Sequence, residues 1–92
     1  MPKILLMGSL RNIFGCAEIS LDETKEMSFT ELIRKLCAKD KRFEQIFEPN
    51  GAPRPGYLVL VDQVDVRIFD DMSKILVKSE SVITIIPVVH GG

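Results

Sequence analysis

The sequence lacks the residues that several classes of functional site require. It contains no tryptophan, one histidine and two cysteines, and Cys16 and Cys37 do not form a Cys-x-x-Cys pair. A structural zinc site needs four ligands, which His90 and two separated cysteines do not supply. We therefore expect no metal site and no bound cofactor.

An excess of charge and long apolar runs are also missing. The formal net charge is −1 with both signs interspersed, so no basic patch indicates direct binding of nucleic acid or of an anionic membrane. No apolar run approaches transmembrane length, and the run in "MPKILLMGSL" is too short for a signal-peptide core. Two free thiols without a secretory signal are typical of a reducing compartment, so we expect a cytoplasmic protein.

The composition that remains, 46% hydrophobic and 27% charged, is that of an ordinary soluble globular domain. The sequence shows no internal repeat, linker or low-complexity segment. We expect one domain over residues 1–92, with a flexible C-terminal Gly-Gly tail from about residue 89 to residue 92.

The N-terminal segment predicts an antiparallel hairpin. Residues 3–9 form an apolar strand, and residues 10–15, "LRNIFG", form a turn that ends at Gly15. Residues 16–21 alternate between apolar and polar side chains, which is typical of a half-buried strand. The alternation leaves Cys16 on the outward face as a passive surface thiol.

Ser28 begins the clearest helix, because Glu31 stands three residues later and can complete a capping box. Apolar residues then recur at helical spacing and predict one buried stripe, in which Cys37 is a core thiol. The stripe consists of Phe29, Leu32, Ile33, Leu36 and Cys37. A second helical turn is expected around "KRFEQIF", with its apolar residues turned inward.

The second half predicts strands separated by turns. After the proline-rich loop "EPNGAPRPG", residues 57–61 are apolar on both faces, as in a central strand. A turn at residues 62–63 leads to a strand over residues 64–69. Asp70 or Asp71 caps a turn or short helix, and residues 81–89 form the last strand. The members of the 64–69 strand expected on one face are Val64, Val66 and Ile68.

Taken together, these elements predict an α+β fold of order ββαβββ, in which four to five strands of a mixed sheet pack on one main helix. A single helix must cover the apolar face of the sheet, because no other element can bury it. The order is compatible with the β-grasp arrangement, although the pattern alone allows several topologies.

The C-terminal segment "SVITIIPVVHGG" is a strand pattern that ends in two glycines. Given average glycine usage, two terminal glycines occur by chance in roughly one chain in 200. These residues alone leave two interpretations open, which are a frayed tail or cloning scar and a functional terminus.

Three segments resemble ubiquitin-like sulfur carriers, and together they span nearly the whole chain. "LRNIFG" is similar to the hairpin of the small subunit of molybdopterin synthase. "RPGYLVLVDQVDV" is similar to the Arg-Pro-Gly-strand-turn-strand block of the ubiquitin-related modifier family. "ITIIPVVHGG" resembles both, and its His-Gly-Gly end is modifier-like. The resemblance implies a β-grasp, ubiquitin-like fold.

The resemblance also implies a protein that is not itself an enzyme. A ubiquitin-activating-type enzyme would use ATP and magnesium to adenylate the carboxylate of Gly92, and a sulfurtransferase would convert it to a thiocarboxylate. Gly91 and Gly92 lack a Cβ, so this backbone can enter a narrow cleft. The implied further partners are a tRNA-thiolation enzyme and lysines of target proteins.

Two other functions remain open at this point. The first is the small subunit of molybdopterin synthase, with the same tail chemistry and the large subunit of the synthase as a stable partner. The second is a β-grasp interaction module whose terminus is inert.

A tail of four residues spans at most about 13 Å, so the folded body must dock close to the activating enzyme. If Ile83 and Ile85 face the helix, Ile86 and Val88 lie on the opposite face of the sheet. A contiguous apolar patch on such a face usually marks an interface. The strand over residues 57–61 adds one of two sets of side chains to this patch, and the pattern does not decide between them. The two sets are Leu58 with Leu60, and Tyr57 with Val59 and Val61. The predicted partner-binding residues are Leu5, Met7, Leu58, Leu60, Ile86, Val88 and His90.

Overall fold

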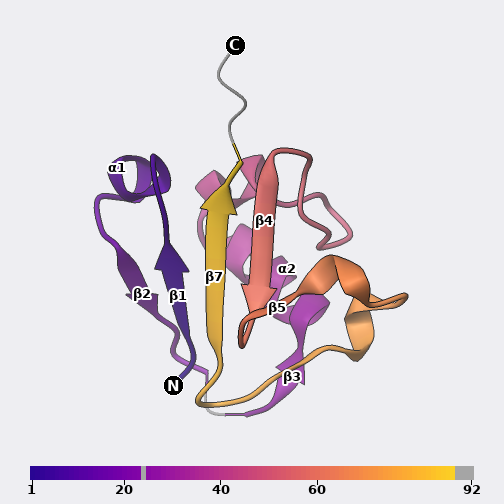
Figure 1. The fold of residues 1–92 in the computed structure, drawn as a ribbon. Coiled ribbons are helices and arrows are strands. Elements are labelled where there is room, and N and C mark those ends of the chain that lie inside the picture. The colour runs from indigo at the N-terminus through magenta and orange to yellow at the C-terminus, as the bar shows by residue number, and fades with distance from the viewer. Residues whose placement is uncertain (24, 89–92) are drawn as a thin grey trace.

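The last strand of the chain lies at the centre of the sheet (Figure 1). The structure, a computed structural model, describes residues 1–23 and 25–88. Within these residues the main sheet has five strands in the order β2-β1-β7-β4-β5, and a second sheet pairs β3 with β6. The strands are β1 (Lys3–Leu6), β2 (Glu18–Ser20), β3 (Met27–Ser28), β4 (Tyr57–Val61), β5 (Val64–Asp65), β6 (Leu76–Val77) and β7 (Val82–Pro87).

The helix α2 (Phe29–Lys39) lies behind the main sheet in Figure 1 and covers one of its faces. Among the described residues, no helix is long and apolar enough to cross a membrane. The other helical segments are α1 (Leu10–Phe14) and the 3₁₀ turns η1 (Lys41–Gln45), η2 (Val66–Ile68) and η3 (Met72–Lys74).

The strand β7 pairs on both sides, parallel to β1 and antiparallel to β4. Ile85 therefore lies between Leu6 on one neighbour and Val59 on the other. The hairpin of β1 with β2 is antiparallel, and Ile4 lies opposite Ile19. This mixed sheet on one main helix confirms the predicted fold class.

The start of α2 confirms the predicted cap. The Oγ atom of Ser28 accepts a hydrogen bond from the backbone N–H of Glu31 at 3.2 Å, which satisfies one of the free donors of the first turn. Four of the five predicted stripe residues are buried, whereas Cys37 is half-buried at the edge of the stripe. The expectation that Cys37 is a core thiol is therefore met only in part, because the side chain packs against the core and is half-buried.

The core fills the space between α2 and one face of the sheet. Ile83 and Ile85 have no exposed surface, which confirms that they face the helix. Val59 and Val61 are buried with them, so Leu58 and Leu60 lie on the opposite face. The sequence pattern left this choice open, and the register of β4 against β7 decides it.

Residues 10–15 form a short helix rather than the predicted turn. Leu10 and Phe14 lie four residues apart on one side of α1, and both are buried. The Phe14 ring packs on Phe43 with centroids 4.8 Å apart, which supplies the stability that a helix this short lacks by itself. Gly15 ends the helix at φ 73°, so the predicted left-handed position is confirmed.

The predicted strand over residues 64–69 was wrong beyond Asp65. The carboxylate of Asp65 accepts the backbone N–H of Arg67 at 2.8 Å and turns the chain into η2. Val66 is fully buried, whereas Val64 and Ile68 are 40% and 70% exposed, so the three do not share a face.

Two further turns carry aspartates in structural roles. Asp71 caps η3 by accepting the backbone N–H of Ser73 at 2.9 Å, which confirms one of the two predicted caps. Asp62 lies in the turn between β4 and β5, and its carboxylate accepts from the Oγ atom of Ser81 and from the N–H of Val82, both at 2.9 Å. The hydrogen bond from the N–H of Val82 to Asp62 anchors the start of β7.

We predict that the two faces of β7 respond differently to the same substitution. Ile85→Ala removes a fully buried side chain and should lower the free energy of unfolding by about 3 kcal/mol. Ile86→Ala, the matched control on the half-buried face, should lower it by about 1 kcal/mol. Urea denaturation measures both, and equal losses would contradict the assigned faces.

Candidate functional site

The face of the main sheet opposite α2 carries a contiguous apolar surface. Leu58 lies directly opposite Ile86, and Leu60 lies opposite Thr84, with Leu5 on the far side of Thr84. All five side chains are half-buried. Within the described residues no helix covers this surface (Figure 1). We call it the open face, and it consists of Leu5, Leu58, Leu60, Thr84 and Ile86.

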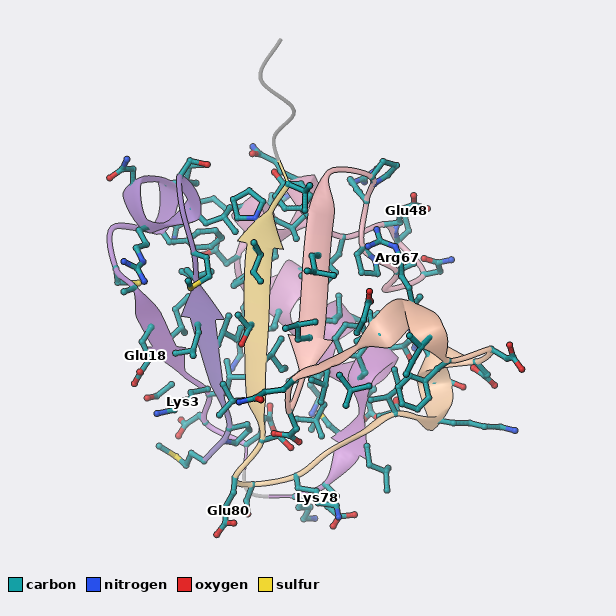
Figure 2. The ribbon with its side chains drawn as sticks, viewed as in Figure 1. Lys3, Glu18, Glu48, Arg67, Lys78 and Glu80 are labelled. Carbon is teal, nitrogen blue, oxygen red and sulfur yellow. The ribbon has the colours of Figure 1, made fainter. Side chains whose placement is uncertain are left out.

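The open face has a charged border and an apolar end. At the β1–β2 edge, Lys3 and Glu18 lie side by side, with 3.7 Å between the Nζ atom and a carboxylate oxygen (Figure 2). Toward the end of β7, Met7 and Val88 are 36% and 42% exposed. The sequence-predicted residues Leu5, Met7, Leu58, Leu60, Ile86 and Val88 thus lie on one side and one end of the sheet.

The predicted tail residues His90, Gly91 and Gly92 lie outside the described residues. The last described residue, Val88, follows β7 directly, at the end of the sheet where α1 and the start of β4 also lie (Figure 1). The described part of the candidate site therefore consists of the groups that fix the position of Val88.

A turn before β4 holds Val88. The backbone N–H of Val88 donates to the carbonyl oxygen of Gly56 at 2.7 Å. Gly56 is the third residue of a turn closed by the N–H of Tyr57 on the carbonyl of Arg54 at 3.3 Å. Pro55 in the second position and Gly56 at φ 97° are the signature of a type II turn. This signature stands in the sequence, but the role of Gly56 was missed.

On the other side of β7, the chain leaving β1 packs close to the same point. The N–H of Met7 donates to the carbonyl of Ile85 at 3.1 Å, which extends the parallel pairing beyond β1. A Cβ atom added to Gly8, which has φ 55°, would lie 3.2 Å from the Cγ atom of Pro87. The end of β7 is thus contacted by both neighbouring segments, with Gly56 at Val88 on one side and with Met7 at Ile85 and Gly8 near Pro87 on the other.

The two thiols differ in their exposure. Cys16 is exposed, as predicted. Burial raises the pKa of the Cys37 thiol, and the negative charge of Glu44 raises it further. Cys37 therefore stays protonated at neutral pH, and it lines a hollow of about 180 Å³ whose charged residues carry both signs. The described residues contain no group of three or more His, Cys, Asp or Glu side chains that could hold a metal ion.

Comparison with known proteins finds one family whose model matches nearly the whole chain. The model described as Urm1 (Ubiquitin related modifier) matches residues 4–92. The X-ray structure of Urm1 from Sulfolobus solfataricus is similar at 27% sequence identity and a TM-score of 0.66, over 94% of this chain and 99% of that chain. No curated protein matches the chain.

Two solved structures that are less similar in sequence share the fold. The small archaeal modifier protein 1 (SAMP1) of Methanosarcina acetivorans is 23% identical with a TM-score of 0.72, covering 99% of this chain and 95% of that chain. A chain in the crystal structure of the Amycolatopsis orientalis BexX/CysO complex is 22% identical with a TM-score of 0.73, and each chain is covered completely. These similarities confirm the predicted ubiquitin-like β-grasp fold.

We predict that Gly56→Ala loosens the contact at Val88. The added Cβ atom meets nothing within 4 Å, but the left-handed φ should cost about 1–2 kcal/mol of stability. The backbone N–H of Val88 should then exchange with solvent roughly tenfold faster in NMR hydrogen exchange, since about 1.4 kcal/mol of lost protection corresponds to that factor.

Gly15→Ala is the matched control, because Gly15 also has a positive φ and open space but no contact with Val88. It should cost a similar amount of global stability and leave the relative exchange rate of Val88 unchanged. Equal acceleration in both variants would show that the Gly56 carbonyl does not hold Val88.

Proposed function

The chain belongs to the ubiquitin related modifier (Urm1) family, so its fold is that of a ubiquitin-like sulfur carrier and modifier, and we propose that its chemistry occurs at the carboxylate of Gly92. An adenylating enzyme of the ubiquitin-activating type would use ATP and magnesium to activate this group. The carboxylate attacks the α-phosphorus of ATP, and pyrophosphate leaves. The protein is the substrate of this reaction and supplies no catalytic residue.

Activation solves a chemical problem that the carboxylate presents. A free carboxylate is a poor electrophile, because its leaving group would be oxide, whereas AMP leaves readily from the mixed anhydride. A sulfide-level donor such as hydrosulfide can then attack the carbonyl carbon and displace AMP, and loss of its proton leaves a thiocarboxylate. The same acyl-adenylate or a thioester made from it can instead acylate a lysine of a target protein.

The observation that supports this proposal most is the way β7 ends. The strand is paired with β4 up to Pro87 and with the β1 segment up to Ile85, and the Gly56 carbonyl accepts a hydrogen bond from Val88. Four residues, 89–92, follow Val88 up to the end of the match to the family. Because four residues span at most about 13 Å, an enzyme can reach the carboxylate only by docking against this end of the body.

The open face is the proposed docking surface for the activating enzyme. Its apolar side chains are continuous with Met7 and Val88 at the end from which the tail begins. The similarity in fold to a chain of the BexX/CysO complex supports a role in which such a domain binds a partner protein. His90 is proposed to orient the tail or to contact the enzyme.

The final sulfur acceptor is proposed to be a wobble uridine of tRNA, thiolated by a cytoplasmic enzyme, with target lysines as a second destination. The family match favours this function over the small subunit of molybdopterin synthase. Affinity purification from native cells separates the two, since a stoichiometric synthase partner supports the second and transient enzymes with lysine conjugates support the first.

We predict that intact-protein mass spectrometry detects the activation directly. Incubation with the cognate adenylating enzyme, ATP, magnesium and a sulfur source should replace one oxygen by sulfur at the C-terminus. Deleting Gly92 should abolish the change and leave the unfolding midpoint unaltered. An unchanged mass of the full chain with an enzyme that activates its own known substrate would identify the inert interaction module instead.

We also predict that a charge on the open face weakens docking. Leu58→Lys should raise the KM for this protein in the adenylation reaction at least about tenfold, because a charge in the centre of an apolar interface is desolvated without a partner. The matched control is Leu76→Lys on β6, where the side chain is 53% exposed and lies outside the open face. The KM of the control should stay within about twofold, and a similar rise in both would exclude the open face as the docking surface.

A further inference from the structure

Arg67 binds the turn that holds Val88. Its guanidinium donates from Nη1 to the carbonyl of Tyr57 at 2.7 Å. Its Nη2 atom donates to the carbonyls of Arg54 at 3.2 Å and Pro53 at 3.3 Å. Figure 2 shows the side chain extending from the segment after β5 toward the loop before β4. One exposed side chain thus links η2 to the loop that leads into β4.

The base of Arg67 is itself held firmly. Its backbone N–H donates to the carboxylate of Asp65 at 2.8 Å, and the preceding residue, Val66, is fully buried. The stem of Arg67 therefore starts from a fixed point on the body, and its three carbonyl contacts restrain the loop with respect to the core.

The restrained carbonyls flank the one that binds the end of β7. Arg54 and Tyr57 stand on either side of the Gly56 peptide, whose carbonyl accepts the N–H of Val88 at 2.7 Å. A turn that rotates about its ends would move this acceptor, and the hydrogen bonds from Arg67 to the carbonyls of Arg54 and Tyr57, at the two ends of the turn, oppose that rotation. Arg67 thereby acts on Val88 through the turn, without touching Val88.

Arginine is suited to this task because its planar guanidinium offers several N–H donors in a rigid fork. A lysine offers one compact ammonium group on a flexible stem, which can satisfy one or two of these carbonyls. A neutral, unbranched side chain such as methionine fills the same length and donates nothing.

We propose that Arg67 is a positioning residue for C-terminal activation, which fixes the point and direction at which the chain leaves β7. This inference rests on the proposed function. The carboxylate of Gly92 is four residues beyond that point, so a change in the position or direction of the chain at Val88 shifts the region that the carboxylate can reach from the docked body. Misplacement of reacting atoms by about 1 Å can cost about 100-fold in rate.

Positioning and simple stabilisation affect different kinetic constants. The open face is unchanged in an Arg67 variant, so docking of the folded body, and with it the KM for this protein, should be preserved. Poor alignment of the carboxylate with ATP lowers kcat. A loss of folded protein instead reduces the effective substrate concentration, which raises the apparent KM and leaves kcat unchanged.

The test measures adenylation of the full chain by its activating enzyme, followed as ATP–pyrophosphate exchange. Arg67→Met should lower kcat about 10- to 100-fold with KM within about twofold, and Arg67→Lys should restore part of the loss. In NMR hydrogen exchange, Arg67→Met should also accelerate the Val88 N–H relative to the N–H of Ile85.

Arg42→Met is the matched control. Arg42 also donates to a backbone carbonyl, that of Ile13 at 3.2 Å, and binds Asp40, but it does not contact the turn. It should leave kcat unchanged. If Arg67→Met and Arg67→Lys both keep the wild-type kcat, the positioning role is wrong. If the wild-type chain is itself not adenylated, the proposed function fails first, and Arg67 has no reaction to position.

Discussion

The pairing of β7 on both sides is the constraint on which the rest of the structure depends. Its six residues place Ile83 and Ile85 against α2 and Ile86 on the open face, because side chains alternate across a strand. The core and the proposed docking surface are therefore two sides of one strand. A shift of one residue in its register would exchange them, so the buried face also determines which residues a partner can reach.

The end of β7 is controlled by loops rather than by the helix. Gly56 accepts from Val88, Arg67 holds the turn that contains Gly56, and Gly8 packs close to Pro87. Each contact uses backbone or a long side chain at the surface, outside the hydrophobic core. Their expected role is to give a short terminal segment a defined starting point, so that binding of the body by an enzyme also places the segment.

The sequence predicted the elements whose signals are local and strong. The Ser28 cap, the stripe of α2 apart from Cys37, the first hairpin and the inward positions of β7 all follow from side-chain spacing, and each is confirmed. The errors in secondary structure fall on short segments. The helix α1 has five residues and β5 has two, so tertiary contacts such as Phe14 with Phe43 decide their conformation. The tail chemistry at Gly92 was predicted from resemblance and remains a proposal.

By itself, the sequence determined the type and order of the main elements, since hydrophobic periodicity and capping act over a few neighbouring residues. The sequence also shows the two glycines at residues 91–92 and the Arg-Pro-Gly signature of the turn before β4. Only the tertiary structure decided which face of β4 is buried, and which groups hold the end of β7. These depend on the pairing of distant segments, such as Gly56 with Val88 and Arg67 with Tyr57, whose proximity no local spacing encodes.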